Sequence, residues 1–152
     1  MYGILDIHFD DSDWDLIKKF TWSLKQSNKK LYVHAIDCES KLKIYMHRLI
    51  MSAPDDKSID HRDGNGLNNR RDNLRFATQS QNMANRDKMS NNTSGFKGVF
   101  KIRNKYKAQI KVNHKSIQGG RLFDNPVDAA RRYNEMALKY FGEYARLNEI
   151  PE

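Results

Sequence analysis

Two adjacent side chains in the middle of the chain, Asp60 and His61, have the chemistry that phosphodiester hydrolysis needs. Hydrolysis requires a water molecule activated by a base, and a cation that stabilises the charge developing on the phosphate and the leaving oxygen. The carboxylate of Asp60 is a hard ligand suited to magnesium. The imidazole of His61 titrates near neutral pH and can take a proton from water. The pair is therefore a candidate hydrolytic centre.

The backbone must bring these two neighbours to one site. Successive side chains of a regular strand point to opposite faces, so the pair can share a site only where the strand bends or ends. The turn-forming sequence DGNG at residues 63–66 follows immediately and indicates such an end. An isolated Asp-His pair is common, so its significance depends on the surrounding segment.

That segment, residues 57–90, predicts two short strands that are joined by a long ordered loop and followed by a helix. It is rich in Asn, Asp and Gly, and too poor in aliphatic residues to form a core alone. We expect strands at Ser58–Arg62 and Asn73–Ala77. A helix is expected from Thr78, which opens a Thr-x-x-Gln capping box.

The same segment resembles a known family. Its motifs are IDHRDGN at residues 59–65, LNNR at 67–70, DNLRFAT at 72–78 and QN at 81–82. Together they resemble the HNH endonucleases of the homing type found in phages and introns, which fold this motif as two strands and a helix around one divalent metal. The sequence YMHRLI at residues 45–50 resembles the segment that leads into the motif, although His47 is more readily explained as a structural histidine than as a ligand.

The resemblance implies a role for four residues. Asp60 and Asn82 would ligate the metal, His61 would be the general base, and Asn73 would brace the loop and orient the histidine. Asn82 falls in the first turn or two of the predicted helix, from where its amide oxygen can reach a metal held by Asp60. The cofactor expected is one divalent ion per chain, magnesium with manganese as the alternative. Zinc is not expected, since the lone Cys38 excludes a multi-cysteine site.

Arginines of this segment are candidate contacts to the substrate. Arg70, Arg71 and Arg75 are predicted to neutralise the phosphate of a nucleic acid. The alternative is that exposed arginines here contact the nucleic-acid backbone generally, or belong to a solvated face.

Residues 1–53 show no catalytic grouping and are expected to support the segment that follows. Their patterns predict a strand at Ile4–Phe9, a helix from Asp11 or Ser12 to about Phe20, strands near Leu31–Ile36 and Leu42–Met46, and a short helix at His47–Met51.

Positive charge is concentrated in the C-terminal part of the chain. Of the formal net charge of +8, residues 1–90 contribute little, with 15 Lys and Arg against 13 Asp and Glu, whereas residues 91–152 hold 12 against 6. No acidic residue occurs between Asp87 and Asp124. A field of one sign suggests a polyanionic partner, although a basic surface kept for solubility is the alternative. No segment is apolar enough for a membrane span, and no secretory signal is apparent, so we expect a soluble intracellular protein, in the host cytoplasm if a phage encodes it.

The C-terminal part alternates polar and apolar residues. Phe96–Arg103, Lys105–Val112 and Lys115–Leu122 predict a three-stranded meander, and a helix capped by Asn125 and ended by Gly142 can cover its apolar face. We expect Phe96, Phe100, Ile102, Tyr106, Ala108, Ile110 and Val112 on the apolar face, and Lys97, Lys101, Arg103, Lys105, Lys107, Gln109 and Lys111 on the basic face.

This part also resembles a known domain. SGFKGV at residues 94–99, YKAQI at 106–110, FDN at 123–125 and FGEYARLN at 141–148 are similar to DNA-binding domains of the Apetala-two or ethylene-response-factor type. In that family the sheet enters the major groove and the helix supports it. GGRL at 119–122 departs from the family pattern and leaves the register of the third strand open. The implied contacts are Lys97, Lys101, Arg103, Lys105, Lys107 and Arg121, with the lysines on phosphates and the arginines on bases.

The sequence therefore predicts an α+β protein: a nuclease domain at 1–86 with its motif core at 57–86, a linker at 87–95, and a three-stranded antiparallel sheet packed on one helix at 96–149. The predicted function is metal-dependent cleavage of double-stranded DNA by a monomer or homodimer. The alternatives are a DNA-binding protein or transcriptional regulator that does not cut, and an RNA nuclease, which is disfavoured because the deep major groove of A-form RNA does not admit a sheet.

Overall fold

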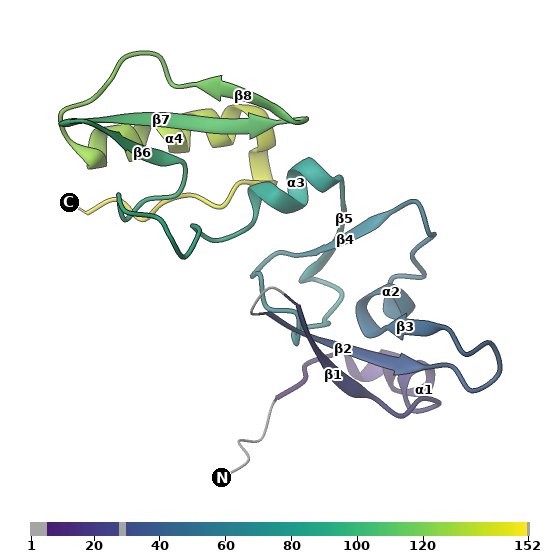
Figure 1. Ribbon diagram of the computed structural model, residues 1–152. Coiled ribbons are helices and arrows are strands. Elements are labelled where there is room, and N and C mark those ends of the chain that lie inside the picture. Colours follow the sequence, from purple (N-terminus) through teal and green to yellow (C-terminus); the bar gives the residue numbers. More distant parts are fainter. Residues whose placement is uncertain (1–5, 28–29, 152) are drawn as a thin grey trace, which may run out of the picture. The chain divides into compact units, whose positions relative to one another are not determined.

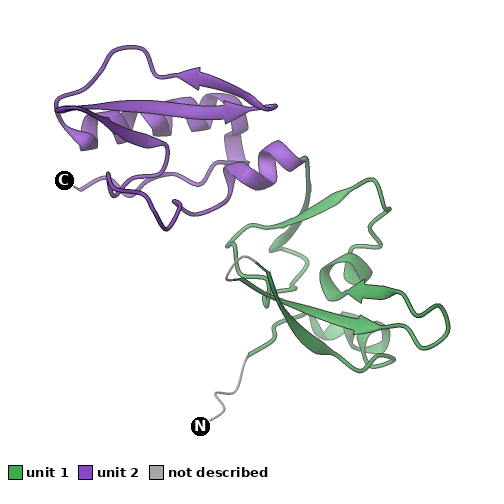
Figure 2. Ribbon diagram, viewed as in Figure 1, with its two compact units in different colours: residues 1–78 green, residues 79–152 purple. Residues whose placement is uncertain are grey.

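The computed structural model describes residues 6–27 and 30–151 and divides into two compact units, Met1–Thr78 and Gln79–Glu152. Helices and small antiparallel sheets occur in both, as expected of an α+β protein (Figures 1 and 2). None of the helices in the described ranges is long and apolar enough to cross a membrane.

Unit 1 holds two antiparallel sheets. One sheet has the order β1-β2-β3, and the other pairs β4 with β5. Along the chain its elements are η1 (Asp11–Asp13), α1 (Trp14–Ile17), β1 (Ser23–Ser27), β2 (Lys30–Ile36), β3 (Lys43–Tyr45), α2 (Met46–Ile50), β4 (Ser58–His61) and β5 (Leu74–Ala77).

Most of the elements predicted for unit 1 are present, with three differences. The first helix ends at Ile17 rather than near Phe20. Strand β1 was not predicted, because most of its residues are polar and exposed and show no apolar alternation. The predicted strand Ile4–Phe9 lies partly outside the described residues, and within them His8 makes only an isolated parallel bridge to Asn68.

The core of unit 1 joins segments that lie far apart in sequence. Apolar side chains from α1, β2, α2, β4, β5 and the β4–β5 loop pack into one cluster. The loop therefore contributes to the core through one of its own residues, and the β4–β5 hairpin is anchored on the support that precedes it. The cluster consists of Ile17, Val33, Met46, Ile50, Ile59, Leu67 and Leu74.

Unit 2 is a three-stranded antiparallel sheet, in the order β6-β7-β8, with a long helix on one face. The helix begins at Asn125, whose side-chain oxygen accepts a hydrogen bond from the N–H of Val127 at 2.8 Å, as the predicted cap requires. The elements are α3 (Gln79–Ala84), β6 (Val99–Ile102), β7 (Lys105–Val112), β8 (Lys115–Gln118), α4 (Pro126–Phe141) and η2 (Gly142–Tyr144).

The two units divide before α3, whereas the predicted linker at 87–95 follows it. Helix α3 belongs with the second unit, because Ala84 is buried in the core beneath β7 and α4, and its carbonyl accepts a hydrogen bond from the N–H of Arg146 at 3.2 Å. The polar segment after α3 is also ordered by hydrogen bonds, among them Ser94 Oγ to the carbonyl of Val99 at 2.8 Å.

The faces of β7 are as predicted, but those of β6 are reversed. Val99 pairs with Ala108 in register, and both are buried toward α4. Phe100 pairs with Lys107 and Ile102 with Lys105, so both apolar side chains share the open face of the sheet with lysines. The prediction was wrong because it placed residues by polarity, whereas the register follows Val99 into the core.

Candidate active site

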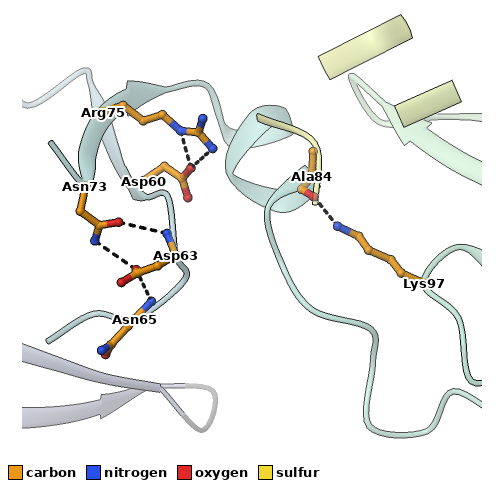
Figure 3. Close-up of polar contacts among 7 residues, drawn as sticks. All are labelled: Asp60, Asp63, Asn65, Asn73, Arg75, Ala84 and Lys97. Carbon is orange, nitrogen blue, oxygen red and sulfur yellow. Dashed lines mark hydrogen bonds and ion pairs between the residues drawn. The ribbon is translucent and has the colours of Figure 1, made fainter. Parts of the chain in front are cut away.

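A network of hydrogen bonds holds the loop between β4 and β5. The side-chain N–H₂ of Asn73 donates to Asp63 Oδ1 at 3.0 Å, while Asn73 Oδ1 accepts from the N–H of Asp63 at 3.1 Å (Figure 3). The same N–H₂ group also donates to the carbonyl of Asn68 at 2.8 Å. The other oxygen of Asp63 accepts from Asn68 Nδ2 at 2.8 Å. Asn73 therefore braces the loop from its far end, and Asp63 is the acceptor on which the bonds converge.

The charge of Asp63 is stabilised by this network. Partial burial by itself raises the pKa of the carboxyl, but hydrogen bonds from the N–H of Asn65 and from the side chains of Asn68 and Asn73 outweigh it and lower the pKa. Sequence reasoning did not assign Asp63 a role beyond the turn. The signal available was its position at the start of the Asp-Gly-Asn-Gly turn, where Asp side chains commonly accept backbone hydrogen bonds.

Asp60 forms a buried ion pair with Arg75 on the neighbouring strand. The two residues are directly opposite in the β4–β5 register, and they are 4% and 7% exposed. Nε and Nη2 of the guanidinium lie 2.9 and 2.8 Å from the same carboxylate oxygen, Oδ2 (Figure 3). Arg75, predicted to contact nucleic acid, instead forms an ion pair with Asp60 inside the unit.

His61 ends β4 and lies among aromatic rings. It is 6% exposed, its ring centroid lies 5.0 Å from that of His47 at an interplanar angle of 79°, and 6.0 Å from that of Tyr32. Asp60 and His61 thus have different neighbours, as adjacent strand residues do. The strand ends at His61, one residue before the predicted end at Arg62, and the N–H of Gly64 donates to the carbonyl of His61 at 2.8 Å.

Burial keeps both histidines neutral. Desolvation lowers the pKa of His61 and outweighs a hydrogen bond with Asn69 and the charges of Asp63 and Asp60, which raise it. Desolvation, followed by the charges of His61 and Arg48, lowers the pKa of His47 to about 3. A neutral imidazole can accept a proton, which is the property that a general base needs.

The remaining arginines of the segment differ in setting. Arg70 is exposed, as a contact to a polyanion requires. Arg71 instead binds Asp13, with Nη2–Oδ1 at 2.6 Å and Nε–Oδ2 at 3.0 Å, and its N–H donates to Asp10 at 2.8 Å. Asp13 is 3% exposed, so this bidentate pair ties the loop to η1. Sequence analysis missed the pair because its partners are 58 positions apart.

The predicted metal ligands are distributed between the two units. Asp60 lies in β4 of unit 1, and Asn82 lies half-buried in α3 of unit 2. No group of three or more His, Cys, Asp or Glu side chains is placed to hold a metal in the ranges 6–27 and 30–151. A magnesium site does not require one, because this ion retains several waters and is often bound through one or two carboxylates. The carboxylate oxygens of Asp60 have the ligand chemistry that magnesium prefers.

The lysines of the C-terminal unit that were predicted to contact DNA lie in three different environments. Lys105 and Lys107 lie on the open face of the sheet, and Lys105 Nζ is 3.0 Å from Asp124. Lys101 is exposed, but it pairs with Tyr106 and therefore belongs to the face of the sheet that carries α4. Lys97 precedes β6 and is half-buried. Its ammonium group donates a hydrogen bond to the carbonyl oxygen of Ala84 (Figure 3).

The two arginines predicted to contact bases lie outside the strands. Arg103 is in the two-residue turn between β6 and β7, with a positive φ of 53°. Arg121 follows β8, and its guanidinium lies 5.5 Å from the ring centroid of Phe123. The strands themselves therefore present lysine, amide and apolar side chains on the open face.

Comparisons with known proteins place the segment around β4 and β5 in a known family. A family model described as HNH endonuclease matches residues 45–84, which include Asp60, His61, Asn73 and Asn82. A protein of Acanthamoeba polyphaga mimivirus, described as an uncharacterized HNH endonuclease, is 36% identical over 141 residues, which cover 90% of this chain and 71% of the relative. No solved structure matches the chain.

Proposed function

The chain belongs to the HNH endonuclease family, and from this premise we propose that it hydrolyses phosphodiester bonds of duplex DNA with the help of one divalent metal ion. The observation that supports the proposal most directly is the end of β4, where the buried carboxyl group of Asp60, paired with Arg75, adjoins a histidine whose pKa is lowered by burial. The homing type is part of this proposal.

His61 is the proposed general base. It follows Asp60 at the end of β4, and the loop after it is fixed by Asn73 and Asp63, so the histidine backbone has little freedom. The low pKa caused by burial keeps the imidazole deprotonated at neutral pH, ready to take a proton from the attacking water. Tyr32 and His47 limit the orientations of the ring.

The metal is proposed to be held by Asp60 and Asn82, with magnesium preferred and manganese as the alternative. When bound, it would stabilise the negative charge that develops on the phosphate. Arg75 binds Oδ2 of Asp60 through Nε and Nη2 and holds the carboxylate in one orientation. The assignment of Asn82 rests on the resemblance of its motif, which the family match includes.

Unit 2 is proposed to bind the DNA that unit 1 cuts. Its sheet presents lysines on the face opposite α4, and no acidic residue interrupts the sequence between Asp87 and Asp124. If about six phosphates are neutralised, the slope of log affinity against log salt is near −5. Arg70 is a further proposed phosphate contact, from unit 1.

Plasmid cleavage tests this function. Purified protein is incubated with supercoiled plasmid in magnesium or in EDTA, in parallel with duplex RNA, and the products are resolved on a gel. We expect open-circle DNA with magnesium only, because one centre per chain cuts one strand, and linear product if the protein acts as a dimer. Salt-sensitive DNA binding without cleavage at any metal would favour a DNA-binding protein instead, and preferential cleavage of RNA would contradict the proposed substrate.

A further inference from the structure

The open face of the unit 2 sheet has an unusual composition for a surface that binds a polyanion. The strand register places eight side chains on this face, away from α4. Five are lysine or apolar, three are neutral and polar, and none of those on the three described strands is arginine. They are Phe100, Ile102, Lys105, Lys107, Gln109, Lys111, Ser116 and Gln118.

Two of these side chains are apolar and exposed. Phe100 is 49% exposed and Ile102 is 37% exposed. Neither contributes to the core, where Val99 takes the buried position of β6. Each stands directly opposite a lysine, Phe100 opposite Lys107 and Ile102 opposite Lys105. An apolar pair flanked by ammonium groups suits a partner with apolar groups between rows of anions.

Two others form a pair of carboxamides. Gln109 and Gln118 are opposite in the β7–β8 register, and Gln118 Nε2 approaches Gln109 Oε1 at 3.5 Å. A glutamine amide matches the N6 and N7 groups of adenine in the major groove, and an apolar side chain such as phenylalanine matches the C5 methyl of thymine. Guanine is recognised mainly by arginine or lysine.

We infer that this face recognises A·T base pairs in the DNA major groove, with Phe100 and Ile102 against thymine methyls and Gln109 and Gln118 against adenine edges. The inference rests on the proposed DNA binding by unit 2 and specifies the sequence preference of that face. Lys105, Lys107 and Lys111 supply the phosphate contacts around the bases.

Charge complementarity selects DNA as the occupant rather than an apolar protein surface. Each exposed apolar side chain of the face stands opposite a lysine, and an ordinary apolar interface depletes charged residues, lysine among them, at its centre. The major groove of B-DNA is wide enough to admit strands, and the thymine methyl is the apolar group that it displays. Arg103 and Arg121 lie in the turn and the loop outside the strands, so the face that the three described strands present carries no arginine.

The inference is tested with the full-length chain in EDTA, so that binding is measured without cleavage. Binding sites are first selected from duplexes with a randomised core, and we expect A·T-rich cores. Each thymine of the selected duplex is then replaced by deoxyuridine, which lacks only the C5 methyl. At the positions that Phe100 or Ile102 contacts, we expect affinity to fall about fourfold, the equivalent of one buried methyl group.

Two variants complete the test. Phe100→Ala should bind thymine and uracil equally at the position that Phe100 contacts, because the side chain that senses this methyl is gone, and should keep the thymine preference at the position that Ile102 contacts. The surface position of Phe100 leaves the fold intact. Lys107→Ala should weaken binding to both duplexes by the same factor and keep the thymine preference. Equal binding of thymine and uracil duplexes by the unaltered protein, or cores selected for guanine, would overturn the inference while leaving DNA binding standing. Absence of any duplex binding would overturn both.

Discussion

Asp60 and Arg75 face each other across the β4–β5 hairpin as a buried ion pair, with Nε and Nη2 of the guanidinium close to Oδ2 of the carboxylate. The pair joins the two ends of the motif loop and fixes the proposed metal ligand before any metal binds. Because both side chains are almost fully buried, neither charge can be solvated if the other is removed.

Arg75→Met should therefore destabilise unit 1 by about 3–5 kcal/mol, since it leaves an uncompensated buried carboxylate. Unfolding in denaturant can be followed by tryptophan fluorescence, because Trp14 and Trp22 both lie in unit 1. The double variant Asp60→Asn with Arg75→Met should recover much of the loss, because no buried charge remains. If Arg75→Met alone leaves the denaturant midpoint of unfolding unchanged, the ion pair does not contribute to the stability of unit 1.

The stability of unit 1 should fall in acid because of His47. Its pKa is about 3 in the folded protein against an ordinary value of 6.5, so the unfolded chain binds the proton more readily. Protonation of His47 in the unfolded chain therefore does not affect the free energy of unfolding above pH 6.5. As the pH falls from 6.5 toward 3, the free energy of unfolding decreases by up to about 1.4 kcal/mol per pH unit. His61 acts in the same direction.

The control for this prediction is His47→Phe, which keeps an aromatic ring beside His61 and Tyr32 but cannot be protonated. Its unfolding free energy should depend less steeply on pH between 6.5 and 4 than that of the unaltered protein. Identical slopes would mean that His47 binds a proton as readily in the folded state as in the unfolded chain.

Gly98 is required by the packing of unit 2. Its φ is 69°, and a Cβ there would lie 2.1 Å from the ring of Tyr133 and 2.8 Å from the carbonyl oxygen of Gln109. Gly98→Ala should destabilise unit 2 by several kcal/mol, through backbone strain and overpacking together. Hydrogen exchange of the β6 and β7 amides measures this.

Gly95→Ala is the matched control. Gly95 also has a positive φ, 83°, but nothing lies within 4 Å of its Cβ position, so only the backbone strain remains, about 1 kcal/mol. Equal losses of protection in the two variants would contradict the close packing of Tyr133 on Gly98.

The sequence was sufficient to predict much of this architecture. The alternation in β7 correctly placed Ala108 and Ile110 in the core, and Asn125 correctly marked the start of α4. The motif around Asp60 and His61 was recognised because its residues are close together in sequence and are followed by the polar, turn-forming residues 63–66, which mark the end of a strand.

What the sequence did not reveal depends on register and on distant partners. Phe100 and Ile102 were assigned to the core by polarity, but the register with β7 turns them outward. Arginine is usually found at the protein surface, and only the cross-strand partner Asp60 explains why Arg75 is buried. Arg71 pairs with Asp13 from the opposite end of the unit, and no local pattern encodes such a contact.

The loop network around Asn73 should be needed for cleavage. Asn73→Ala removes the donor to Asp63 and Asn68 and leaves a partly buried N–H of Asp63 without its acceptor, at a cost of about 1–3 kcal/mol. The rate of plasmid nicking should fall, while DNA affinity should not. Asn91→Ala, an exposed asparagine of unit 2, serves as the control and should change neither. A normal nicking rate in Asn73→Ala would show that the loop tolerates the loss of its brace.

The most direct test of the nuclease centre at the end of β4 is the initial rate of magnesium-dependent plasmid nicking by His61→Ala, measured beside the unaltered protein. Loss of a general base costs about a hundredfold or more in rate, whereas binding of the plasmid in EDTA should be retained. Nicking by His61→Ala at the unaltered rate would contradict the assignment of His61 as the base and with it the proposed centre.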